Sequence, residues 1–240
     1  MNRYHSVPGR WSRTEVGRLL AGAAGISSPG MRIEFISRQF LGVPYQASTL
    51  AGRAGADEVL TIDLGGMDCF TFLDYVEAMR HSASVTAFRE NLIGTRYRSG
   101  TISFAARNHF FTDWREFNAD RVEDVTAQVG GTAAVSVSRT LNRKQDGTLF
   151  LDGIEPVERL LTYIPSGLPD NRGMDLLQTG DYAGIFSAEP GLDVSHVGIL
   201  VRDGGSLVLR HASHRQGKVI DEDLAGYLSG RPGLIILRPR

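Results

Sequence analysis

The sequence has few features that indicate disulfides, thiolate metal sites, a strongly charged partner or a membrane. Its 240 residues include one cysteine, Cys69, which excludes an internal disulfide and a zinc site built from thiolates. Its 26 basic and 27 acidic residues nearly balance, so no global charge attracts nucleic acid or an anionic membrane. No stretch approaches the roughly 20 apolar residues of a membrane span. What remains is the composition of an ordinary globular protein.

The N-terminal segment has one apolar run, at residues 19–26, that could be an export signal. Glycines interrupt this run, and the sequence before it, Ser12 to Glu15, has the form of a helix capping box. A soluble helix is therefore expected here. We expect a soluble protein, cytoplasmic if the chain is full length, and periplasmic or in the cell envelope if a signal was removed before residue 1.

Helical periodicity comes first along the chain, and strand-like alternation comes later. After the capping-box helix, helices are predicted at residues 31–41, from Cys69 onward, at 85–93 up to Gly94, at 156–163 and at 221–228. Strands are predicted at residues 58–62, 133–138, 180–186, 194–201, 207–213 and 234–237. This order, without regular strand and helix repetition, predicts an α+β fold. The chain has no visible repeat or linker, so we expect one domain, residues 31–240, with residues 1–30 as a helical appendage.

Cys69 stands where a glycine turn runs into a helix. Gly65 and Gly66 form the turn, Asp68 is a good N-cap, and apolar residues follow at helical spacing at positions 72, 73, 76 and 79. The thiol then lies in the first helical turn, where unpaired N–H groups and the helix dipole favour the thiolate. The alternative is that Cys69 is only a small apolar residue at the buried end of an amphipathic helix.

Two histidines lie on a predicted hairpin formed by residues 194–202 and 207–213. If Arg202 pairs with Leu207 across a four-residue loop, His211 lies opposite Gly198, and His196 is its diagonal neighbour on the same face. Such a pair can supply a base, His196, and a second ring that orients it, His211.

Other interpretations of these histidines remain open. They can be ordinary half-buried polar residues of a strand face. Two histidines and one cysteine can also bind zinc, but structural zinc sites take four ligands and catalytic sites take three around the metal. His214 has the opposite parity to His196 and is expected to be exposed.

Arginines and aromatic residues are dense between Arg96 and Trp114. Arg96, Arg107 and Asn108 are candidates for holding carboxylates or the polar groups of a sugar, and Trp114 is a candidate for stacking on a sugar ring. The alternative is that the arginines are structural ion-pair partners and the aromatics are core. His109 lies outside the hairpin and is not included with the catalytic residues.

Four short motifs occur in an order that resembles the NlpC/P60-like cell-wall cysteine peptidases, a papain-like superfamily. The motifs are Gly42-Val43-Pro44-Tyr45, Asp68-Cys69, Gly180-Asp181, and His196-Val197-Gly198-Ile199 followed by His211-Ala212-Ser213. The resemblance implies a papain-like α+β fold, in which the nucleophile begins a helix packed on an antiparallel sheet that carries the catalytic histidines. It implies catalysis by Cys69, His196 and His211, with Tyr45 and Asp68 beside the substrate or the oxyanion.

The chain departs from the common pattern, most visibly by an insertion at about residues 94–170. With its arginine-rich blocks and Trp114, it resembles an N-acetylmuramoyl-L-alanine amidase-like branch over roughly residues 35–240. That branch implies cleavage of the amide between the lactyl group of muramic acid and L-alanine. The implied substrates are peptidoglycan fragments, including anhydro-muropeptides, during wall recycling, and no metal or organic cofactor is implied.

Two alternatives stay open at this point. One is a γ-D-glutamyl-diamino-acid endopeptidase, which would cut within the stem peptide and leave the muramic acid bond whole. The other is a non-catalytic protein that binds wall fragments, with Cys69 as a packing residue. A thiol unreactive at neutral pH, or a His196 far from the sulfur, would favour the second alternative. The sequence leaves the oligomeric state open.

Overall fold

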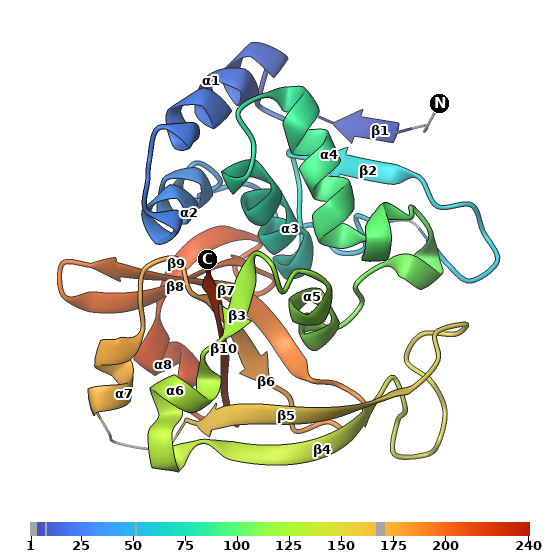
Figure 1. Cartoon of the computed structure of the whole chain (residues 1–240), viewed down its shortest axis with the longest axis vertical. Coiled ribbons are helices and arrows are strands. Elements are labelled where there is room, and N and C mark those ends of the chain that lie inside the picture. The colour runs from blue at the N-terminus through green and yellow to red at the C-terminus, as the bar shows by residue number, and fades with distance from the viewer. Residues whose placement is uncertain (1–3, 8, 51, 167–170) are drawn as a thin grey trace.

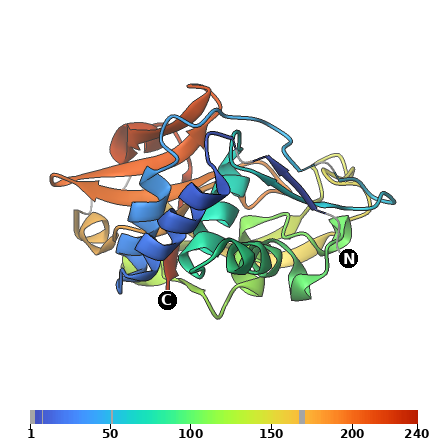
Figure 2. The ribbon, with the colours of Figure 1, turned by 90° about the horizontal axis from the view of Figure 1, so that it is seen from above.

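The first half of the chain forms a mostly helical part, and the second half forms a mostly β part below it in Figure 1. The computed structural model describes residues 4–7, 9–50, 52–166 and 171–240. Its α-helices are α1 (Arg13–Ala24), α2 (Pro29–Arg38), α3 (Cys69–Arg80), α4 (Val85–Arg96), α5 (Phe111–Phe117), α6 (Thr126–Gly130), α7 (Asn171–Leu176) and α8 (Leu224–Leu228). Single 3-10 turns are η1 (Arg98–Gly100), η2 (Phe104–Ala106) and η3 (Gly131–Ala133). Figure 2 shows α1 and α2 in front of the sheet.

The main sheet is antiparallel, and its strands run in the order β4-β5-β10-β6-β7-β8-β9, with β3 also paired to β10. The strands are β3 (Val122–Asp124), β4 (Val135–Leu141), β5 (Val157–Pro165), β6 (Tyr182–Phe186), β7 (Val194–Asp203), β8 (Ser206–Ser213), β9 (Lys218–Asp223) and β10 (Gly233–Pro239). A separate parallel pair joins β1 (Tyr4–Val7) to β2 (Leu60–Asp63). Together the elements make an α+β fold. Among the described residues, no helix combines the length and the apolar character needed to cross a bilayer.

Helix α3 is the central helix of the fold, and it packs on β7 and β8 and between α2 and α4. Its apolar residues Phe72, Leu73, Val76 and Met79 are fully buried, as their spacing predicts. Burying a side chain of this size contributes about 1.5–3 kcal/mol before entropy is counted. The first turn of α3 is therefore held against the strands that carry the histidines.

The N-terminal helix shares this core. Val16, Leu19 and Leu20 of α1 belong to the same buried cluster as Phe72 of α3. Helix α1 begins at the capping box that its sequence predicts, with Ser12 and Glu15 bonding each other's backbone N–H groups. The predicted boundary at residue 30 therefore does not coincide with a break in the packing.

Three predicted elements differ from the structure. Residues 157–165 form strand β5 instead of a helix, because residues 157–163 pair with β4 and residues 164–165 pair with β10. A short apolar run does not distinguish the two states, so the partner strand decides. Helix α4 continues through Gly94 to Arg96. Residues 218–223, partly assigned to a helix, form strand β9 beside β8.

The β7–β8 hairpin has the predicted register, with Arg202 opposite Leu207. Its turn is tighter than the four-residue loop expected, because Asp203 also pairs with Ser206 and only Gly204 and Gly205 remain. Both glycines have positive φ, 54° and 97°, which a two-residue turn of this kind demands and which other residues rarely adopt.

Candidate active site

Cys69 is the first residue of α3, directly after its N-cap Asp68. One carboxylate oxygen of Asp68 accepts the backbone N–H groups of Phe70, at 3.1 Å, and Thr71, at 2.8 Å. The Thr71 hydroxyl in turn accepts the N–H of Asp68 at 3.1 Å, which completes a capping box. The predicted N-cap is confirmed. Within the described residues, this arrangement leaves the N–H of Cys69 itself without an acceptor.

The two histidines contact each other directly. Nε2 of His196 lies 2.7 Å from Nδ1 of His211, with the rings almost perpendicular at 88°. Gly198 makes room for this pair, because a Cβ there would lie 3.1 Å from Cβ of His211. The predicted shared face of the hairpin is therefore present.

A carboxylate contacts the other ring nitrogen of His211 and extends the series of hydrogen bonds. Oε2 of Glu222, on β9, lies 3.3 Å from Nε2 of the buried His211, and Glu222 also pairs with Arg215. A carboxylate accepts hydrogen bonds, so Nε2 of His211 carries the proton and its Nδ1 accepts one from Nε2–H of His196. Nδ1 of His196 is then left with a free lone pair.

Cys69 and His196 line the same cavity, which has a volume of about 350 Å³. Phe110, Phe150 and His109 form part of its wall. Cys69 is half-buried, and the backbone N–H of Val197, the neighbour of His196, is close enough to favour its thiolate. The thiol and the imidazole therefore face one shared space.

Burial sets the charge state of the thiol. It raises the pKa of Cys69 to about 12, and the charge of Asp68 acts in the same direction. The backbone N–H groups of Val197, Cys69 and Phe70 lower this pKa, but burial outweighs them. The N–H groups at the helix start favour the thiolate as expected, but burial keeps the thiol protonated.

Burial also keeps the imidazole neutral. It lowers the pKa of His196 to about 3, with smaller contributions from His211 and the positive charge of Arg231. Burial lowers the pKa of His211 as well, against the opposing effect of Glu222. At neutral pH a protonated thiol and an unprotonated imidazole therefore line the same cavity, one a proton donor and the other a proton acceptor.

Tyr45 is brought to the thiol by its backbone bridge to Met67. Burial raises the pKa of Tyr45, and the negative charges that Cys69 and Asp68 can carry raise it further. The phenol is therefore protonated and available as a donor. Its ring also lies 5.2 Å from the ring of His214, which is exposed as its parity predicts.

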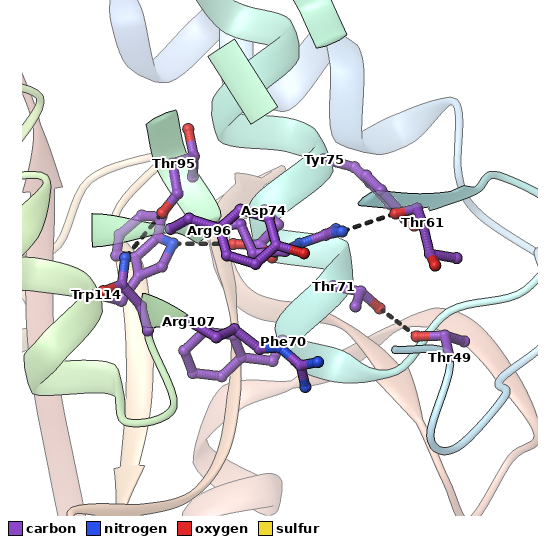
Figure 3. Close-up of polar contacts among 12 residues, drawn as sticks. Thr49, Thr61, Phe70, Thr71, Asp74, Tyr75, Thr95, Arg96, Arg107 and Trp114 are labelled. Atoms are coloured by element: carbon purple, nitrogen blue, oxygen red, sulfur yellow. Dashed lines mark hydrogen bonds and ion pairs between the residues drawn. The ribbon is translucent and has the colours of Figure 1, made fainter. Parts of the chain in front are cut away.

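Arg96 and Trp114 both point toward Asp74 of α3 (Figure 3), and neither lines the cavity beside Cys69. Nε of Arg96 donates to Asp74 at 2.7 Å, and Nη1 donates to the carbonyl of Thr61 at 2.7 Å. Nε1 of Trp114 donates to the other oxygen of Asp74 at 3.1 Å. Both side chains are about 1% exposed or less. The prediction that they contact substrate is corrected, because both side chains are buried and donate hydrogen bonds to the buried Asp74.

Asn108 and Arg107 also bond within the protein. The buried Asn108 donates its amide to the carbonyl of Thr95 at 3.0 Å, so its predicted substrate contact is corrected too. Arg107 forms a two-pronged ion pair with Glu58, and Tyr97 donates to the same carboxylate at 2.8 Å. Arg107 does not line the cavity beside Cys69.

Glu222 and Tyr227 are site residues that the sequence analysis missed, and His109, which it named but set aside, lines the cavity beside Cys69. Tyr227 lies with its ring 5.0 Å from His211 and 6.0 Å from His196. The alternation of residues 218–223 was the available signal for Glu222, since a strand there places it diagonal to His211. Among the described residues, no three metal-binding side chains converge.

A thiol and an imidazole facing one cavity are the two groups of a nucleophilic hydrolase. The family model described as AmiA-like, N-acetylmuramoyl-L-alanine amidase-like, matches residues 35–234. The chain belongs to this family of amidase-like hydrolases.

Solved structures share the fold over most of the chain. The protein LPG0564 from Legionella pneumophila superposes with a TM-score of 0.80 at 23% identity, covering 95% of this chain and 94% of its own. An N-acetylmuramoyl-L-alanine amidase from Bacteroides uniformis has a TM-score of 0.68 at 27% identity, covering 85% and 97%. A protein from Bacteroides fragilis described as a putative xylanase has a TM-score of 0.63 at 27% identity, covering 84% and 98%. No curated protein sequence matches the chain.

Proposed function

We propose that this protein is a cysteine-dependent N-acetylmuramoyl-L-alanine amidase that hydrolyses the amide between the lactyl group of muramic acid and L-alanine. Its family membership supports the reaction class. The observation that carries the mechanism is the 2.7 Å contact between Nε2 of His196 and Nδ1 of His211, which leaves Nδ1 of His196 for the thiol in the shared cavity. The proposal includes a papain-like, NlpC/P60-type relationship, supported by the order of the sequence motifs.

In the first step, Nδ1 of His196 takes the thiol proton as the sulfur of Cys69 attacks the lactyl carbonyl carbon. The carbonyl oxygen becomes an oxyanion. The unbonded N–H of Cys69 and the phenol of Tyr45 are the donors placed to stabilise it. Because the resting pair is neutral, proton transfer and attack occur together and no preformed thiolate is required.

In the second step, the tetrahedral intermediate collapses, and His196 gives its proton to the departing nitrogen of L-alanine. The stem peptide leaves with a free amino group, and a thioester links the lactyl group to Cys69. His196 then takes a proton from water, which attacks the thioester. Collapse of this second intermediate returns the proton from His196 to the sulfur and releases the muramic acid carboxylic acid, which loses its own proton to solvent.

The cavity beside Cys69 suits the sugar end of such a substrate. Phe110 and Phe150 give it aromatic surface, and His109 gives it a polar edge. Nε2 of His109 donates to the carbonyl of Phe104 at 2.7 Å, so the ring is held in place. We extend the proposal to soluble muropeptides, anhydro forms included, as substrates of wall recycling.

Glycoside hydrolysis, the activity named for one structural relative, is less well supported. Its common mechanisms need two carboxyl groups on opposite sides of the bond. Among the described residues, the wall of the cavity holds one carboxylate, Asp193. That carboxylate is buried and accepts from the N–H of Thr112 at 2.7 Å and from its hydroxyl at 2.8 Å. The thiol and imidazole therefore favour acyl transfer.

The two alternatives from the sequence predict different products. A γ-D-glutamyl endopeptidase separates the second and third stem residues, and a binding protein releases nothing. The high pKa of Cys69 taken alone favours the binding protein, but a neutral imidazole on the same cavity supplies the missing proton acceptor.

Mass spectrometry of products from an intact muropeptide and from its free stem peptide tests the proposal. The wild type should release a stem peptide with a free N-terminus from the muropeptide and leave the free peptide unchanged. Cys69→Ala and His196→Gln should release none, whereas His5→Gln, a change at an exposed histidine of β1, should behave as wild type. Cleavage of the free peptide would favour the endopeptidase. Equal products from wild type and Cys69→Ala would overturn the proposal.

A further inference from the structure

A second cavity, of about 360 Å³, lies against the same two histidines. His196 and His211 form part of its wall, and Tyr227, Arg215 and Arg231 line it as well. Unlike the aromatic cavity beside Cys69, this cavity is lined mainly by polar and charged groups. Both cavities therefore reach the imidazole of His196.

The charges in this second cavity do not cancel. Arg215 pairs with Glu222, the carboxylate that also contacts His211, so these two charges are used within the protein. Arg231 forms no ion pair among the described residues. The lining therefore carries one net positive charge from its arginines and its one carboxylate, Glu222.

Arg231 is also held in a fixed position. Its guanidinium lies 4.1 Å from the ring centroid of Tyr227, and its Nε donates to the carbonyl of Tyr227 at 2.7 Å. The side chain is half-buried, whereas Arg215 is 73% exposed. A positioned arginine with free N–H groups is the usual partner of a carboxylate, which it binds through two parallel hydrogen bonds.

We propose that this second cavity binds a carboxylate of the stem peptide that leaves from the scissile amide, with Arg231 as its anchor. The inference rests on the proposed amidase function. The second residue of a γ-linked stem continues through its side-chain carboxyl, so its α-carboxylate is free. That group lies about two residue lengths, roughly 7 Å, from the scissile amide. The aromatic cavity then takes the sugar, and the second cavity takes the peptide.

Binding of a carboxylate here also affects the base. The charge of Arg231 is one of the causes that lower the pKa of His196. A bound carboxylate offsets this charge, which raises the basicity of His196 when substrate is present. The subsite thus couples recognition of the leaving peptide to the proton transfer that releases it.

Two matched probes test the subsite. Both are N-acetylmuramoyl-L-alanyl-D-glutamate γ-methylamide, one with a free α-carboxylate and the other with an α-carboxamide. For the wild type, kcat/KM should be roughly tenfold or more higher for the carboxylate, because a hydrogen bond between charged groups is worth more than a neutral one. The difference should appear in KM, through binding of the carboxylate, and in kcat, through the raised basicity of His196.

Variants at Arg231 assign the preference to this residue. Arg231→Gln should reduce the ratio between the probes to about one, and Arg231→Lys should keep part of it. Arg89→Gln is the matched control, because Arg89 also stacks on a tyrosine, Tyr4, but lies on α4 and lines neither of the two cavities. The control should keep the wild-type ratio.

The ratio for a folded variant is the decisive result. Equal cleavage of both probes by the wild type, or an unchanged ratio in Arg231→Gln, would overturn the subsite while leaving the amidase function intact. If the wild type cleaves neither probe at the lactyl amide, the proposed function itself fails. Thermal melting of each variant shows that the comparison concerns folded protein.

Discussion

Two polar clusters lie near α3, one around Asp74 on the helix itself and one on strands β7 to β9, and they differ in where their hydrogen bonds end. In the cluster around Asp74, both carboxylate oxygens are taken, one by Arg96 and one by Trp114. In the cluster around His211, a chain from Glu222 through His211 to His196 ends at a cavity with a free nitrogen. Burial and polarity are common to both, so the open end is what distinguishes a reactive cluster from a structural one.

The two clusters also use charge differently. The Asp74 cluster contains a compensated ion pair, 1% exposed on both sides. The histidine cluster keeps its inner members neutral, because burial lowers the pKa of both His196 and His211. The first arrangement stabilises one structure, and the second leaves a proton acceptor on the same cavity as a thiol.

The largest expected effect concerns catalysis at the cavity where the histidine cluster ends. Cys69→Ala should lower the rate of amide hydrolysis by at least about a thousandfold, because covalent catalysis is lost. The midpoint of urea unfolding should change little, since the side chain is small and half-buried. A variant that kept more than a tenth of wild-type turnover on a muropeptide would remove Cys69 from the mechanism.

A change in the Asp74 cluster should instead lower the stability of the fold. Arg96→Leu leaves Asp74 without its buried partner and should lower the free energy of unfolding by about 3–5 kcal/mol. Urea unfolding followed by circular dichroism measures the loss. Arg89→Leu, at a half-buried arginine of the same α4 without an ion pair among the described residues, is the control. If both variants lost the same stability, the Asp74 cluster would not be a special structural element.

Removing the carboxylate of Glu222, at the far end of the hydrogen-bonded series from His196, should affect the rate more than substrate binding. Glu222→Gln removes the carboxylate that fixes the tautomer of His211 and should lower kcat by about tenfold to a hundredfold with KM little changed. Steady-state kinetics on a muropeptide measures the split. Glu123→Gln, at an exposed ion pair with Arg240, should leave both constants as in wild type. A rise in KM alone would contradict a role through His211.

The smallest expected effect is a pH dependence of stability. Unfolded histidine binds a proton near pH 6.5, but folded His196 does so only near pH 3, so the unfolded state binds more protons between these values. The contribution of His196 to stability is therefore present above about pH 6.5 and is lost as the pH falls toward 3. Melting temperatures at pH 7 and 4.5 should fall less in His196→Gln than in wild type. Equal slopes would mean that His196 titrates normally in the folded protein.

The parts of the site that the sequence predicted depend on short-range geometry. The N-cap of Asp68 on Thr71 spans three residues, and the pairing of Arg202 with Leu207 spans one hairpin. Such contacts are encoded by spacing and strand alternation, so they can be inferred without the rest of the chain. The place of the thiol and the shared face of the two histidines followed from them.

The errors concern segments whose state depends on a distant partner. Residues 157–165 became a strand because β4 pairs with them, and residues 218–223 became a strand because β8 does. The second error hid Glu222, since a helix at that point would have directed its side chain elsewhere.

The sequence by itself determined a thiol at the start of a helix and two histidines on one face of a hairpin, because both depend on local hydrogen bonds and alternation. Only the tertiary structure decided that the thiol is protonated, that Glu222 stands behind His211, and that Arg96 serves Asp74. Burial and pairing between distant elements set those outcomes, and no local pattern records how deeply a group will be buried or which charge will lie beside it.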